Sequence, residues 1–242
     1  MTVKSYGLTD IGMVREENQD NFLIDELHCL FMVADGMGGL DDGTAASLFT
    51  IRGIYGMMKS FLEKHNEAAD TLSCIRYIKK SINDVNSHLR GALGRNIGST
   101  VVLVKIMNND VLFVNVGDSP GYLYRNGKLK QMTRDHNIAG AMAEMKQITP
   151  AEAKVHPAHN RLTAFIGMNG TIQASVSRSK IQAGDKLLLC TDGLTGMVEE
   201  KTIENVLEYE PDVENAVKKL VGMANEAGGM DNVTVILAEI GE

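Results

Sequence analysis

The order in which helical and strand periodicity alternate along the chain constrains its fold more than any other feature. A helix is predicted over 44–63 and a second over 67–93, where Ile75, Ile78 and Ile82 recur on one helix face. Runs of β-branched residues come before and after this pair, and a second helix pair is predicted near the C-terminus. The predicted strands cover 22–25, 29–35, 99–107, 111–118, 121–125, 127–133, 171–178, 186–191 and 233–240, and the later helices cover 199–208 and 212–227.

This order of strands, two helices, strands, two helices and a final strand predicts an α+β fold. Each helix pair has an apolar face to bury, and two packed sheets with helices outside them bury every such face. The chain has 242 residues, 44% of them hydrophobic, and neither a repeat nor a linker divides it. We therefore predict one domain over 1–242.

Polar turns and one long irregular segment separate the predicted elements. The turns Asn108–Asn109–Asp110 and Asn126–Gly127 each lie between two strand-like runs, which is typical of β-hairpins. Residues 134–170 are irregular and polar, with one short helix predicted around 150–155 that starts at Pro150. A connection of this length inside a compact domain is usually a lid, a binding loop or disordered.

Charge and cysteine content exclude several classes of protein. The formal net charge of −7 argues against nucleic-acid binding, which needs clustered positive charge, and against attachment to anionic membranes. Three widely spaced cysteines fit neither a disulfide framework nor a zinc cluster. The N-terminus has no apolar stretch of the signal-peptide type, and no run is long enough to span a bilayer. We expect a soluble, cytoplasmic protein, and nothing requires more than a monomer.

Acidic residues stand at the edges of several predicted apolar strands. Asp35 and Asp192 each precede a glycine, Asp231 follows Gly228–Gly229–Met230, and Asp20 directly precedes the first predicted strand. Carboxylates gathered at strand ends repel one another unless a cation is bound, and oxygen ligands suit Mg²⁺ or Mn²⁺. Any single Asp–Gly pair is better explained as an ordinary turn. Together, the acids favour a metal site of a hydrolase-like kind.

Five segments, in order along nearly the whole chain, resemble the successive motifs of a known family. The family is that of the metal-dependent serine/threonine protein phosphatases, also called PPM or type 2C, and the resemblance is to its compact bacterial members. The segments are TDIGMVREENQDNF (9–22), MVADGMGG (32–39), VNVGDSP (114–120), LCTDGLTGMV (189–198) and GGMDNVTVI (228–236).

The resemblance implies a four-layer α-β-β-α sandwich, with two mostly antiparallel sheets flanked by helix pairs. It also implies two divalent metal ions, Mn²⁺ or Mg²⁺, in a cleft at one edge of the sheets. By position in the motifs, Asp35 would bridge the two metals, and Asp20 would join it on one side, directly or through water. Asp192 and Asp231 would hold the other metal, and the carbonyl oxygen of Gly36 would be a further ligand.

The resemblance also implies the reaction and its substrates. Arg15 would bind the substrate phosphate, because its planar guanidinium group donates two parallel hydrogen bonds to phosphate oxygens. Without the motif, Arg15 is an ordinary surface arginine. A water activated by the two metals would hydrolyse phosphoserine or phosphothreonine in proteins, opposing a bacterial Ser/Thr kinase. The alternatives are a phosphatase dedicated to one small regulator and an inactive phosphoprotein-binding module. The joint presence of four acids and Arg15 argues against the inactive module.

Three positions depart from the family pattern. Met37 stands where eukaryotic members have a histidine proposed as the general acid, so the proton donor is unassigned. Asp118 is a candidate ligand for a third, weaker metal, or equally a cap at a strand end. Pro120 and Gly196 replace residues usual around that third site, which therefore stays open. The segment 137–170 matches the family's flap beside the active site, and such loops often select substrates.

Overall fold

A computed structural model describes residues 2–39, 42–65, 70–93 and 97–241. The strands are β1 (Val3–Asp10), β2 (Asp20–Asp25), β3 (Leu30–Met37), β4 (Gly98–Ser99), β5 (Val101–Met107), β6 (Asp110–Val116), β7 (Gly121–Arg125), β8 (Lys128–Gln131), β9 (Ser175–Lys180), β10 (Lys186–Cys190) and β11 (Val233–Ile240). The helices are α1 (Asp42–His65), α2 (Thr71–Leu93), α3 (Ile138–Glu144), α4 (Pro150–Lys154), α5 (Asp192–Thr195), α6 (Glu200–Tyr209) and α7 (Val213–Glu226).

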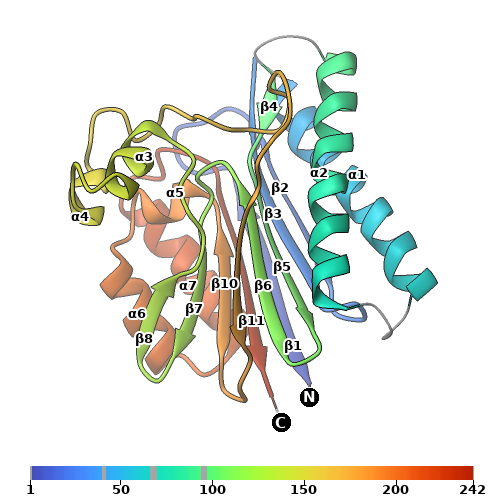
Figure 1. The fold of residues 1–242 in the computed structure, drawn as a ribbon. Helices are drawn as coiled ribbons and strands as arrows, with labels where there is room; N and C mark the ends of the chain where they lie inside the picture. Colours follow the sequence, from blue (N-terminus) through green and yellow to red (C-terminus); the bar gives the residue numbers. More distant parts are fainter. Residues whose placement is uncertain (1, 40–41, 66–69, 94–96, 242) are drawn as a thin grey trace.

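The strands form two antiparallel sheets that pack face to face. One sheet has the order β1-β11-β10-β7-β8, and the other has the order β2-β3-β5-β6-β9, with β4 paired to β3. Helices α1 and α2 cover the outer face of the second sheet, whereas α6 and α7 cover the first (Figure 1). The predicted four-layer α-β-β-α sandwich is therefore confirmed.

The core consists of three apolar layers, one between the sheets and one beneath each helix pair. On β10, Leu187 and Leu189 point into the layer between the sheets, whereas Leu188 packs beneath α6 and α7. Side chains alternate along a strand, so a strand buried on both faces must be apolar throughout. Each such leucine contributes about 1.5–3 kcal/mol through burial. This accounts for the uninterrupted hydrophobic runs in the sequence.

Both predicted hairpin turns are confirmed. Asn108 and Asn109 have φ values of 48° and 65°, and Asn126 and Gly127 have φ values of 52° and 74°. Two consecutive residues in the left-handed region give a turn whose twist matches the twist of the flanking strands. Asparagine and glycine adopt this region at low cost, so these turns fix the pairing of β5 with β6 and of β7 with β8.

The structure adds elements that the sequence did not predict. Strand β1 lies at a sheet edge and, among the described strands, pairs only with β11. Its side chains are therefore only partly buried, and its sequence lacks clean alternation. Helix α3 has few large apolar residues and depends on Asn137, whose side chain accepts a hydrogen bond from the Gly140 amide. The short α5 follows β10 directly.

Most of the predicted helix boundaries agree with the structure. Helix α1 begins at Asp42, two residues before the predicted start, and α4 confirms the short helix around 150–155. Residues 67–69, where the second helix was predicted to begin, lie outside the described residues. In the described part of the chain, no helix has both the length and the apolar character needed to cross a bilayer.

Candidate metal centre

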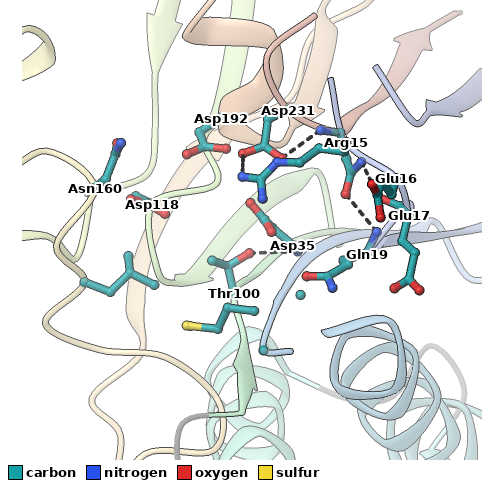
Figure 2. A pocket seen from close by; sticks show the side chains of 15 residues that line it. Arg15, Glu16, Glu17, Gln19, Asp35, Thr100, Asp118, Asn160, Asp192 and Asp231 are labelled. Atoms are coloured by element: carbon teal, nitrogen blue, oxygen red, sulfur yellow. Dashed lines mark hydrogen bonds and ion pairs between the residues drawn. The ribbon is translucent and has the colours of Figure 1, made fainter. Parts of the chain in front are cut away.

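Four carboxylates from distant parts of the chain meet at one end of the sandwich. Asp35 lies near the end of β3, Asp118 follows β6, Asp192 follows β10, and Asp231 precedes β11. All four line a single pocket of about 430 Å³. Figure 2 shows the carboxylates of Asp35, Asp192 and Asp231 close together, with Asp118 to one side. The structure thus brings together four of the five acids singled out from the sequence.

Non-local strand pairing produces this gathering. Asp35 lies opposite Asp20 in the antiparallel β2–β3 pair. At the end of the other sheet, the amide of Thr191 donates a 3.0 Å hydrogen bond to the carbonyl oxygen of Thr234. That bond holds the start of α5 beside the start of β11, so Asp192 and Asp231 face the same space.

The carboxylates occupy an environment that opposes their negative charge. Burial raises the pKa of Asp35 well above its ordinary value, and the charges of Asp20, Asp192, Asp231 and Asp118 raise it further. The pKa of Asp192 is also raised, mainly by burial and then by the charge of Asp231, although a hydrogen bond shared with Asp35 opposes the shift. Asp35 and Asp192 therefore each interact with every other acid of the group.

Asp20 lies behind the pocket and does not line it. It is only 5% exposed, and its Oδ2 atom accepts hydrogen bonds from the hydroxyl groups of Thr191 (2.9 Å) and Thr234 (2.7 Å). Burial raises the pKa of Asp20 to about 7, although these two hydrogen bonds oppose the shift. Its carboxylate links β2 to the two strand ends that carry Asp192 and Asp231.

Arg15 provides the positive charge of the pocket. Its Nη2 atom donates a 2.7 Å hydrogen bond to Oδ2 of Asp231, and the Arg15 side chain is 55% exposed (Figure 2). This hydrogen bond and the Asp231 charge raise the pKa of Arg15 above its ordinary value. Among the described residues that line the pocket, one arginine faces four aspartates together with Glu16 and Glu17. Such a site strongly favours a bound cation.

Gly36 allows a close approach of backbone at the pocket wall. Its amide donates to the carbonyl oxygen of Gln19 at 3.1 Å. A Cβ atom at this position would overlap the carbonyl oxygen of Gly43 in α1 and would lie 2.6 Å from that of Gln19. Only glycine lets the end of β3 pass between these two segments.

Two polar residues that the sequence analysis missed position the site. The hydroxyl of Thr100 accepts a 3.0 Å hydrogen bond from the Asp35 amide, and the Thr100 amide donates to the Asp35 carbonyl oxygen at 2.8 Å. The Asn232 side chain accepts from the Gln19 amide and donates to the carbonyl oxygens of Ile11 and Glu17. Asn232 directly follows Asp231, but its partners lie more than 200 positions away, so local sequence gave no signal for them.

The carboxylates are near one another without forming a tight cage. In the described ranges, no three Asp, Glu, His or Cys side chains are grouped so that they hold one ion by themselves. One candidate ligand, Asp231, is paired with Arg15 in the structure. An ion in this pocket would complete its coordination with main-chain oxygen and water, as Mg²⁺ commonly does.

Comparisons with known proteins find similar sequences and similar structures. The family model described as protein phosphatase 2C matches residues 14–238. The chain is 33% identical over 240 residues to the serine/threonine phosphatase stp of Listeria welshimeri. This alignment covers 96% of this chain and 93% of that protein. The PPM Ser-Thr phosphatase MsPP from Mycobacterium smegmatis, solved in complex with cacodylate, superimposes over all of both chains with a TM-score of 0.86 and 33% identity.

A further similar structure carries metal ions. It is the catalytic domain of the serine threonine protein phosphatase PstP in complex with two manganese ions, with a TM-score of 0.83, 27% identity and 99% of each chain covered. The matching family model spans most of this chain, and the named relatives cover it almost completely. The chain therefore belongs to the protein phosphatase 2C family and is a serine/threonine phosphatase.

Proposed function

We propose that this phosphatase hydrolyses phosphoserine and phosphothreonine in proteins with two divalent cations held by Asp35, Asp192, Asp231 and the carbonyl oxygen of Gly36. The convergence of carboxylates from separate strand ends on one pocket carries this proposal. Their donors are hard oxygen atoms, which suit Mn²⁺ or Mg²⁺. The PstP relative with two manganese ions supports the same choice.

Each acid has a distinct part in the proposed centre. Asp35 lies opposite Asp20 in the β2–β3 pair and lines the pocket together with Asp192 and Asp231, and it would serve both ions. Asp192 and Asp231 would hold one ion from the end of the other sheet. Asp20 would join Asp35 at the other ion, directly or through water. It is buried behind the pocket, and its hydrogen bonds to Thr191 and Thr234 hold together the strand ends that carry Asp192 and Asp231.

The bound ions would supply charge neutralisation for the phosphoryl oxygens and a water of lowered pKa. Arg15 binds the phosphate of the substrate, because a guanidinium donates two parallel hydrogen bonds to phosphate oxygens. In the structure that guanidinium is engaged with Asp231, and it is exposed enough to turn toward a ligand. Substrate phosphate would therefore replace Asp231 as the partner of Arg15, and Asp231 would then be available to hold a cation.

Asp118 is proposed as a ligand of a third, weaker ion. It lines the same pocket, and burial followed by the charge of Asp192 raises its pKa to about 7. Its Oδ2 atom accepts a 3.3 Å hydrogen bond from Asn137, the residue that caps α3. A third ion would therefore connect the centre with the segment that carries α3 and α4. Pro120 and Gly196 add no side-chain ligand there.

Protein-bound phosphoresidues are the proposed substrates, and a Ser/Thr kinase that phosphorylates them is the proposed opposing enzyme. The names of the relatives as serine/threonine phosphatases support this class of substrate. The exposure of the Arg15 and Asp231 side chains in the pocket also supports it, because a phosphorylated side chain can reach them while the rest of the substrate stays outside.

Metal-controlled hydrolysis tests the proposal. We expect hydrolysis of p-nitrophenyl phosphate and of a phosphothreonine peptide with Mn²⁺ or Mg²⁺, none with excess EDTA, and recovery when metal is added back. A control for the loss of an acidic side chain is Asp84→Asn, because Asp84 lies on α2 and pairs with Lys80 on the surface. This variant should show the same metal dependence as the wild type. Full activity in excess EDTA would contradict a mechanism that depends on metal ions.

A further inference from the structure

Three large apolar side chains are exposed to solvent beside the phosphate-binding arginine. Met13 is 69% exposed, Val14 is 55% exposed, and Met230 is 56% exposed. Other methionines in the chain, such as Met32 and Met58, are completely buried, so exposure is not their general state. Single exposed apolar residues are common on protein surfaces, but a contiguous group next to an active site marks a binding surface.

Two contacts hold together the two loops that carry these side chains. The Met13 amide donates a 2.8 Å hydrogen bond to the carbonyl oxygen of Gly229, and Arg15 pairs with Asp231 at 2.7 Å. The loop that carries Met13 is therefore joined to the loop before β11 on both sides of Met230. A Cβ atom at Gly229 would lie 2.7 Å from Cγ of Met13, so the methionine packs directly over this glycine. We call Met13, Val14 and Met230 the methionine ridge.

The ridge lies within reach of residues that neighbour a bound phosphoresidue. Met13 is two positions from Arg15, so their Cα atoms are at most about 7 Å apart. An extended peptide advances about 3.3 Å per residue, so side chains one to three residues from the phosphorylated position would meet the ridge. The ridge is thus within reach of a substrate chain that leaves the phosphate site on this side of Arg15.

The ridge also borders a second cavity that continues from the metal pocket. This cavity of about 890 Å³ lies between the segment with α3 and α4 and the start of α6, and Met230 lines it. It shares Asp118, Asn160, Asp192 and Asp231 with the metal pocket. Met230 is therefore the member of the ridge that lies at the edge of this cavity.

We propose that the methionine ridge docks an apolar side chain located within three residues of the phosphoserine or phosphothreonine in the protein substrate. The inference rests on the proposed function, because it assumes that Arg15 holds the phosphate. Methionine is flexible and polarisable, so such a surface accepts apolar side chains of different shapes. Its location next to the phosphate site, and not on an outer helix face, identifies the substrate as the occupant.

Phosphothreonine peptides that differ at one position test this. Each peptide has alanine around the phosphothreonine, with a single leucine placed at one of the positions −3 to +3, and kcat/KM is measured with Mn²⁺. We expect leucine to raise kcat/KM by about 3- to 10-fold over alanine at one or two positions. In the double variant Met13→Ser, Met230→Ser, this leucine-to-alanine ratio should fall toward one.

Two further variants separate docking from loss of structure. Met13→Leu, Met230→Leu keeps an apolar ridge and should retain the leucine preference. Leu72→Ser removes an apolar side chain that is 59% exposed on α2, away from the pocket, and should also retain it. Because each ratio compares two peptides on the same protein, a general change in activity does not affect it.

The remaining outcomes are also decisive. Equal kcat/KM for all peptides in the wild type, or a preference that survives in the serine variant, would overturn the ridge proposal and leave the proposed function standing. No hydrolysis of any phosphopeptide would overturn both. Wild-type dimers in light scattering that dissociate in the serine variant would show that a second copy of the chain covers the ridge, which also overturns the proposal.

Discussion

The guanidinium of Arg15 donates a 2.7 Å hydrogen bond to the carboxylate of Asp231, a residue 216 positions further along the chain. The two roles proposed for these residues, phosphate binding and metal binding, are therefore coupled before any ligand arrives. Phosphate competes with Asp231 for Arg15, and a cation competes with Arg15 for Asp231. Binding of one ligand should therefore favour binding of the other.

Replacing Arg15 should weaken substrate binding. For Arg15→Ala we expect kcat/KM for a phosphothreonine peptide to fall by about 10- to 100-fold, mainly through KM, because charge-assisted hydrogen bonds contribute about 1.5–3 kcal/mol. Arg15→Lys should be intermediate, since a point charge cannot donate two parallel hydrogen bonds. Steady-state kinetics with saturating Mn²⁺ measure this. A KM unchanged from wild type in Arg15→Ala would rule out phosphate binding by Arg15.

Replacing a central carboxylate should remove turnover while the fold stays intact. We expect Asp35→Asn and Asp192→Asn to lower kcat by about 100-fold or more, because each removes charge that positions the catalytic ions. The metal-free melting temperature should not decrease, since burial and neighbouring charges disfavour the ionised carboxylates. Calorimetric titration with Mn²⁺ should show weaker binding. Normal turnover in either variant would place the metal centre elsewhere.

The metal-free protein should be more stable at pH 5.5 than at pH 7.5. The pKa values of Asp20 and Asp118 are raised to about 7, mainly by burial, and those of Asp35 and Asp192 are also raised. The folded state holds these protons more tightly than the unfolded state, so their contribution is complete below pH ~4 and is lost as pH rises toward 7.

Thermal melts of metal-depleted protein measure this effect. Saturating Mn²⁺ should stabilise the protein more at pH 7.5 than at pH 5.5, because metal binding requires deprotonated carboxylates. A metal-free melting temperature that rises steadily from pH 5.5 to pH 7.5 would contradict the assigned direction of the pKa shifts.

Two Gly→Ala substitutions should have opposite effects on stability. At Gly36 a methyl group would overlap backbone atoms of Gly43 and crowd Gln19, so we expect Gly36→Ala to lower the free energy of unfolding by about 1–3 kcal/mol. Gly56 is exposed within α1, and a methyl group added there would meet no atom of the described residues. Gly56→Ala should therefore raise the free energy of unfolding by about 0.5–1 kcal/mol. Urea unfolding compares the two, and equal stability of both variants would argue against the tight passage at Gly36.

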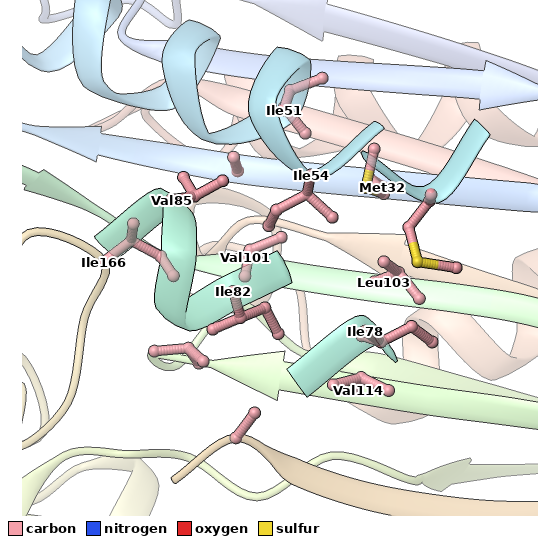
Figure 3. Close-up of a cluster of buried hydrophobic side chains, with 14 of the residues drawn as sticks. Met32, Ile51, Ile54, Ile78, Ile82, Val85, Val101, Leu103, Val114 and Ile166 are labelled. Atoms are coloured by element: carbon pink, nitrogen blue, oxygen red, sulfur yellow. The ribbon is translucent and has the colours of Figure 1, made fainter. Parts of the chain in front are cut away.

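The sequence alone determined the elements that depend on local periodicity. The apolar face of α2 was readable from its spacing, and Figure 3 shows Ile78, Ile82 and Val85 packed toward Leu103 of β5 and Ile54 of α1. The hairpin turns were readable because asparagine and glycine adopt left-handed backbone conformations at low cost. The last strand was predicted with the bounds that the structure gives it.

Elements at the margins of the fold were not readable in this way. Strand β1 is defined by its pairing with β11, more than 200 positions away, and not by an apolar pattern of its own. Helix α3 is fixed mainly by the cap at Asn137 and by its position beside the metal pocket. Local sequence contains neither kind of information.

For the site, the sequence supplied the acids at the strand ends, and the resemblance to a family supplied their proposed roles. Only the tertiary structure put Asp20 behind the pocket, brought Arg15 to Asp231, and placed Thr100 and Asn232 around them. The reason is physical: hydrophobic periodicity reports which face of an element is buried, whereas the meeting of distant strand ends depends on sheet order and register, which long-range pairing decides.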